Sequence, residues 1–109
     1  MPLVVKLLGN GGISGAATTA LYTAPSTVLG TIVNNLRIVN TAATSTTINL
    51  FFTPNGGSQV RILDKDRSIL SNDLLVVSPE LTMGPSDKIE LTSVSGAALD
   101  FVVSGVEKQ

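Results

Sequence analysis

The chain has 109 residues, with seven lysine and arginine residues against eight aspartate and glutamate residues, and it contains no histidine, cysteine or tryptophan. The length predicts a single domain. The missing cysteine excludes a disulfide framework and a thiolate metal site, and the missing histidine removes the usual general base and metal ligand. We therefore expect no enzyme, no catalytic residues, no metal and no cofactor.

The charged residues are few and scattered. They make up 14% of the chain, against about 25% in an average soluble domain. The basic side chains form no stripe that could follow a phosphate backbone, so we expect no nucleic-acid partner. No apolar stretch approaches the roughly 20 residues that a membrane helix needs, so we expect a soluble protein without a membrane partner.

The first segment is apolar and is followed by a glycine-rich stretch. Residues 2–8 predict a strand, and the four glycines of residues 9–15 predict a flexible tether. We expect residues 1–17 to form an arm that adds a strand to a neighbouring chain. Residues 18–109 then form the folded domain. The predicted contact residues of the arm are Leu3, Val4, Val5 and Leu7.

Short strands separated by turn residues fill the rest of the chain. The predicted strands are 18–23, 28–40, 47–53, 59–63, 74–78, 81–83, 88–92 and 99–106. Asn55-Gly56 predicts a tight hairpin, and a second hairpin is expected around residues 84–87, where Asp87 bonds the backbone amides of the turn. No helical periodicity is present. The fold class predicted is all-β, a single antiparallel β-sandwich of about eight strands, jelly-roll or immunoglobulin-like, with an N-terminal arm.

The strands carry more apolar residues than one core needs. If Ile48, Leu50 and Phe52 point inward, Phe51 points outward. Such an excess indicates either a sheet face covered by another chain or an error in the assumed register. We favour the first, which predicts a symmetric homo-oligomer. The outward apolar residues predicted at this interface are Val39, Phe51, Leu75, Val77 and Val102.

Three segments invite a chemical interpretation. Asp64 and Asp66, with Asp73 nearby, resemble a calcium loop, but the basic residues among them favour solvated loop charges. The glycines of residues 9–15 lack the spacing of a phosphate loop and no helix follows them. Tyr22 and Phe51 are a weak sugar-stacking platform. A hydrolase that uses two carboxylates is a third, disfavoured class.

Four short segments resemble a known group of proteins. They are residues 21–25, 38–41, 84–91 and 103–107, with the sequences LYTAP, IVNT, GPSDKIEL and VSGVE. In this order they resemble small β-sandwich virion proteins of tailed bacteriophages, from residue 20 onward. In this chain Ser86-Asp87 stands where such relatives tend to have Gly-Asp, and residues 1–17 lie outside the resemblance.

The resemblance implies a binding role without a catalytic centre. It points to a capsid cement (decoration) subunit, often a trimer, located in the virion and assembled in the cytoplasm of the host bacterium. Its expected partners are further copies of itself and the major capsid protein or other virion proteins. The alternative is a tail or head-to-tail accessory module that binds a receptor or carbohydrate through loops 40–46, 54–58 and 93–98.

Overall fold

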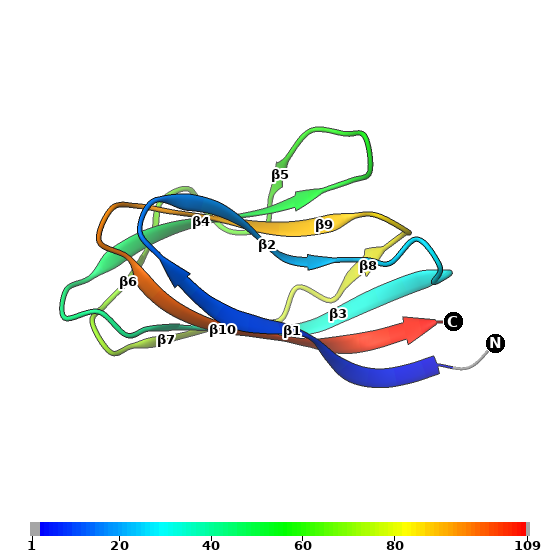
Figure 1. Ribbon diagram of the computed structural model, residues 1–109, viewed down its shortest axis with the longest axis horizontal. Helices are drawn as coiled ribbons and strands as arrows, with labels where there is room; N and C mark the ends of the chain where they lie inside the picture. The colour runs from blue at the N-terminus through cyan, green and yellow to red at the C-terminus, as the bar shows by residue number, and fades with distance from the viewer. Residues whose placement is uncertain (1–2, 109) are drawn as a thin grey trace.

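The computed structural model describes residues 3–108, and the side chains of residues 7–108. These residues form ten β-strands in two antiparallel sheets, which pack face to face as a sandwich (Figure 1). No helix in this part of the chain is long and apolar enough to cross a membrane.

Sheet A contains β1 (Leu3–Ser14), β10 (Ala98–Lys108), β3 (Gly30–Asn40), β7 (Leu74–Val77) and β8 (Leu81–Met83). Sheet B contains β2 (Ala17–Thr23), β9 (Lys88–Ser93), β4 (Thr46–Thr53), β5 (Val60–Arg61) and β6 (Arg67–Ile69). Two short strands share one edge in each sheet: β7 and β8 both pair with β3, and β5 and β6 both pair with β4.

The strand order is that of a jelly roll. Counting β5 with β6 and β7 with β8 as interrupted strands gives the orders β1-β10-β3-β7/β8 and β2-β9-β4-β5/β6. The chain therefore alternates between the sheets at most connections, and the first and last strands pair with each other. Both β1 and β10 reach the same end of the sandwich (Figure 1). The predicted β-sandwich is confirmed, and this topology selects the jelly-roll alternative over the immunoglobulin-like one.

The core lies between the sheets. Leu36 and Ile38 of β3 and Leu50 of β4 are completely buried, as are Ile89 and Leu91 of β9. Each is separated from the next core residue on its strand by a residue of the opposite face, because side chains alternate along a strand. The alternation predicted for β4 and β10 is confirmed: Leu50 and Phe101 are buried, whereas Val102 is exposed.

The glycine-rich segment after Leu8 is not a tether. Residues 9–14 continue β1 and pair with residues 98–103 of β10, after an irregularity in register between Leu7 and Gly9. A Cβ at Gly9 would lie 2.6 Å from the carbonyl oxygen of Leu21 in sheet B. Glycine is therefore required here because two backbones approach closely, and not because the segment is flexible.

The hairpin expected around residues 84–87 is also wrong. β8 pairs with β3 in sheet A, whereas β9 pairs with β2 and β4 in sheet B, so this turn carries the chain between the sheets. The turn chemistry itself is confirmed, because the Asp87 carboxylate accepts a hydrogen bond from the Gly84 amide at 2.8 Å. At Asn55-Gly56 the chain does turn back, because Phe52 pairs with Val60, but the seven residues between them make a longer connection than the tight hairpin expected.

In two strands the inward and outward residues cannot be assigned by simple alternation. In β3, Val33 pairs with Gly105 and Asn35 with Ser104, so Asn34 is an extra residue and Ile32 faces away from the core. In β7, Val77 pairs with the inward-facing Leu36, and Leu75 and Val77 therefore face inward. The prediction that these two residues point outward is wrong.

Candidate functional site

One outer face of the sandwich is apolar. We call it the sheet A face, and it is built from the outward positions of β1, β3, β7, β8 and β10. Its exposed apolar residues are Leu7 (54% exposed), Val76 (46%), Ile32 (44%), Leu74 (44%) and Val102 (38%), with Val39 and Val106 half-buried among them. These five are more than half of the nine large apolar residues that are exposed in the described part of the chain. Exposed apolar area gathered on one face is typical of a surface that another protein covers.

The outer face of sheet B is polar by contrast. The Thr53 hydroxyl donates a hydrogen bond to Glu90 Oε1 at 2.6 Å, and the Gln59 amide donates to the same oxygen at 3.3 Å. These bonds, that of Thr53 first, lower the pKa of the Glu90 carboxyl because they favour its charged form. The guanidinium of Arg61 covers the half-buried Phe51 ring at 5.0 Å from its centroid. The polar side chains of this face therefore bond to one another, and they cover its one aromatic ring.

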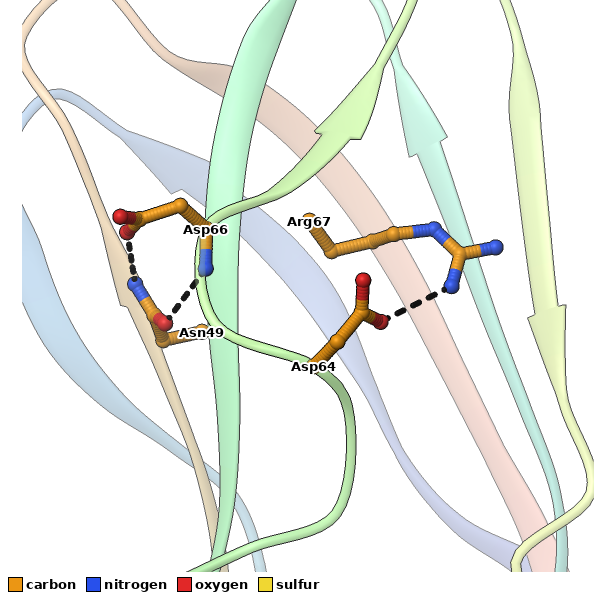
Figure 2. Close-up of polar contacts among 4 residues, drawn as sticks. All are labelled: Asn49, Asp64, Asp66 and Arg67. Atoms are coloured by element: carbon orange, nitrogen blue, oxygen red, sulfur yellow. Dashed lines mark hydrogen bonds and ion pairs between the residues drawn. The ribbon is translucent and has the colours of Figure 1, made fainter.

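The aspartates of the loop before β6 belong to the polar face. Figure 2 shows that Asp64 and Asp66 have different partners: Asp64 accepts from Arg67 at 3.1 Å, and Asp66 accepts from the Asn49 amide at 3.0 Å. Asn49 Oδ1 accepts in turn from the Asp66 backbone amide and from Arg61. Within residues 3–108 no three His, Cys, Asp or Glu side chains come together as metal ligands.

A small pocket lies in the sheet A face. It has a volume of about 180 Å³ and apolar walls. This is below the roughly 300 Å³ at which pockets for small-molecule ligands begin, so it suits a single aliphatic side chain better than a free ligand. Its lining residues are Gly30, Thr31, Ile32, Thr82, Val106 and Lys108.

The residues predicted at an interface are divided between several places. Leu7, Val39 and Val102 lie on the sheet A face. Phe51 lies on the polar face under Arg61, and Leu75 and Val77 pack against the core. The side chains of Leu3, Val4 and Val5 lie outside the described residues, although their backbone belongs to β1.

Sequence reasoning missed three of the five exposed apolar residues of the sheet A face: Ile32, Leu74 and Val76. In β7 four aliphatic residues follow one another, so no alternation indicates which two face outward. Val76 pairs with the outward Arg37, which shows that Val76 and Leu74 are the two that face outward. For Ile32 the only available signal was the Asn34-Asn35 pair, where two polar residues in succession mark the irregularity in β3.

Tyr22 is not available as a sugar platform, because it is buried. Its hydroxyl donates to Glu107 Oε2 at 2.8 Å and lies 3.0 Å from Thr31 Oγ1. The pKa of Tyr22 is raised to about 12, with burial as the largest cause and smaller contributions from the hydrogen bond and negative charge of Glu107. This buried polar cluster links sheet B to two strands of sheet A.

The three loops of the receptor-binding alternative do not form one surface. Loops 40–46 and 93–98 meet at one end of the sandwich, where the Thr41 amide donates to the carbonyl of Ala98 at 2.9 Å. Loop 54–58 follows the opposite end of β4, and its Asn55 amide bonds Asp87 instead. Any site that uses all three loops would have to span the whole length of β4.

Comparisons with known proteins find relatives in structure alone. No family model matches the chain, and no curated protein sequence matches it. Among solved structures, a chain of the cyanophage Pam1 capsid asymmetric unit matches with a TM-score of 0.50 and 14% identity, over 98% of this chain and 85% of that one. The infectious bursal disease virus VP2 subviral particle matches with a TM-score of 0.52 and 13% identity, over 99% of this chain and 32% of the other.

A third structure comes from outside the viruses. The NLP core of Drosophila, described in connection with pentamer formation and histone binding, matches with a TM-score of 0.53 and 11% identity, over 90% of this chain and 97% of that one. The chain spans about a third of the bursal disease virus proteins that it matches. At these identities the likeness establishes a shared fold, one that viral capsid proteins also have.

Proposed function

We propose that this chain is a structural subunit of a bacteriophage particle, a cement or decoration protein that stabilises the capsid through protein contacts and performs no catalysis. The observation that carries the proposal is the difference between the two outer faces of one sandwich. Sheet A exposes Leu7, Ile32, Leu74, Val76 and Val102, whereas sheet B exposes a hydrogen-bonded polar network. Soluble monomers rarely expose a face of this kind, and it is typical of a surface that other chains cover.

Two further observations support a virion role. The fold is shared with chains of viral capsids, and the jelly roll is a common architecture of capsid domains. The sequence resembles small virion proteins of tailed phages in segments that belong to strands and turns of both sheets. We accordingly propose partners of two kinds, further copies of the chain and the major capsid protein, with a trimer as the state that the resemblance favours. The assembled protein is located in the virion, after assembly in the host bacterial cytoplasm.

The experiment uses capsids of the same virus assembled without this protein. The purified chain is added, unbound chain is removed by sedimentation, and the temperature of capsid rupture is measured. We expect stoichiometric binding and a higher rupture temperature. The Val102→Lys variant places a charge in the apolar face and is expected to bind at least about tenfold more weakly, since burying an unpaired charge is costly.

The matched control is Thr92→Lys, which adds the same charge at an outward position of β9 on the polar face. This variant should bind like the unmodified chain. Capsids that bind none of the unmodified chain, and that rupture at an unchanged temperature, contradict the cement role. The tail or head-to-tail accessory module then becomes the candidate, to be tested by binding to host cells and to glycans.

A further inference from the structure

Two opposite charges lie on β3 and β10, the two central strands of the sheet A face, and a third charge, Lys108, lies at the far end of β10 beside the pocket. Arg37 of β3 pairs in register with Val102, and Asp100 of β10 pairs with Val39, so the two charged residues are diagonal neighbours on the outward side. Both are exposed, and neither makes a hydrogen bond or an ion pair with another residue of the described chain. They are therefore available to a partner.

This arrangement is electrically complementary to itself. When a second copy lies on the face about a two-fold axis so that its Asp100 meets Arg37, its Arg37 also meets Asp100 of the first copy; in a ring the two charges of one copy meet the two neighbouring copies. A partner surface of uniform charge would attract one of the two residues and repel the other. The charges thus favour another copy of this chain as the occupant of the face.

The dimensions of the face agree with such an interface. β10 contains 11 residues, which at about 3.4 Å each extend roughly 37 Å. Strands at four positions, about 4.8 Å apart, give a width of roughly 19 Å and an area of about 700 Å². A stable interface of standard size buries about 800 Å² on each partner. Covering this one face is therefore close to sufficient for a stable pair.

We propose that the sheet A face is the surface through which copies of this chain pack on one another, with Arg37 of one copy against Asp100 of the next. The apolar residues around the two charges supply the buried area, and the charges set the relative position of the copies. The inference deepens the proposed function, and rests on it in taking the apolar face to be an assembly surface. It does not require a capsid to be tested.

The experiment measures self-association of the full chain by sedimentation velocity over a range of concentrations. Arg37→Asp and Asp100→Arg each bring like charges together and should weaken self-association at least about tenfold. The double variant Arg37→Asp/Asp100→Arg exchanges the two charges and should restore the affinity to within about threefold. The control Lys65→Asp makes the same charge change in an exposed loop next to sheet B and should leave the affinity unchanged.

A mixture of the two single variants distinguishes the symmetry of the assembly. In a two-fold pair, one copy of each variant gives two opposite-charge contacts, so the mixture should associate as tightly as the unmodified chain. In a three-fold ring, any mixture leaves one contact between like charges, so only the double variant recovers. Both results support the proposed face.

Three outcomes overturn the inference: an unmodified chain that stays monomeric at high concentration, single variants that associate like Lys65→Asp, or a double variant that fails to recover. Circular dichroism of each variant verifies that the sandwich is folded. Capsid binding that is unaffected by these substitutions removes this inference and leaves the proposed function standing. If the charge variants change self-association as expected but the chain does not bind capsids, this inference stands and the proposed function is removed.

Discussion

The buried cluster that joins the two sheets can be tested at Tyr22. The perturbation is an increase in pH, which ionises the Tyr22 hydroxyl. Its hydroxyl donates to Glu107 Oε2 at 2.8 Å, and both side chains are almost completely buried. Ionising the hydroxyl would bury a second negative charge beside the Glu107 carboxylate. The folded state therefore holds the phenol proton much more tightly than the unfolded chain does.

The magnitude follows from the shift in pKa. The pKa of Tyr22 is raised from 10.0 to about 12, mainly by burial. Because the folded pKa lies above the unfolded one, the stabilisation is fully present below pH 10 and is lost as the pH rises toward the folded pKa. Two pH units at 1.36 kcal/mol each give a maximum loss of roughly 3 kcal/mol. This is a large fraction of the roughly 5 to 15 kcal/mol that stabilises a typical domain.

The assay uses the ultraviolet absorbance of tyrosinate. Tyr22 is the one tyrosine of the chain and there is no tryptophan, so the titration reports a single group. We expect a midpoint near pH 12 for the folded protein and near pH 10 in denaturant. Glu107→Gln should lower the folded midpoint while keeping it above 10, because burial is the larger cause. The unfolding free energy is measured against pH for the unmodified chain and for Tyr22→Phe. The difference between the two curves is the contribution of Tyr22, because the lysines contribute equally to both.

A midpoint near pH 10 in protein that circular dichroism shows to be folded would refute this reasoning. It would mean that the hydroxyl is solvated and that the link between Tyr22 and Glu107 is absent. A pKa of Tyr22 that Glu107→Gln leaves unchanged would retain burial as a cause and remove the carboxylate.

Two further substitutions test the packing at opposite ends of the sandwich. Gly105→Ala should destabilise the fold by about 3 kcal/mol or more in urea denaturation, because its Cβ would overlap the carbonyl oxygen of Ile32. Asn40→Ala should cost about 2 to 3 kcal/mol, because the Asn40 amide bonds the carbonyls of Thr44, Ile69 and Leu70 while its oxygen accepts from Ala42. Hydrogen exchange should then speed up in loops 41–45 and 70–73.

The glycine substitution has a matched control. Gly56→Ala adds a methyl group where no atom lies within 4 Å, so only the left-handed backbone contributes, at about 1 to 2 kcal/mol. Equal losses for the two glycine variants would contradict the close approach of β10 to β3. For Asn40, exchange rates that rise evenly over the whole chain, and not in the two loops first, would contradict its role in holding them.

Local pattern was a good guide where polar and apolar residues alternate cleanly. In β4 and β10 it gave the correct inward and outward residues, including the exposed Val102. It failed in β7, whose four residues are all aliphatic, and in β3, where the extra residue Asn34 reverses the faces. A one-residue shift moves every following side chain to the other face, and only the partner strand reveals it.

Turn residues likewise predicted the local turns correctly, but they did not indicate whether the two strands that a turn connects pair with each other. Gly84 to Asp87 form the turn that their sequence predicts, yet it connects two sheets and not two paired strands. Likewise, the sequence shows several glycines after Leu8 but not the reason for them. Only the position of Leu21 in the other sheet shows that close packing requires Gly9.

The amino-acid sequence by itself determined most of the strands, the turns and the all-β class, because these depend on residues close together in the chain or on composition; it did not indicate the strand at residues 9–14 or β6. The tertiary structure alone decided which strands pair and therefore which face is apolar. It placed Arg37 of β3 diagonally beside Asp100 of β10, and Tyr22 against Glu107, 85 residues away. The physical reason is that strand pairing joins distant segments through main-chain hydrogen bonds, which are alike for every residue and leave no local signal of the partner.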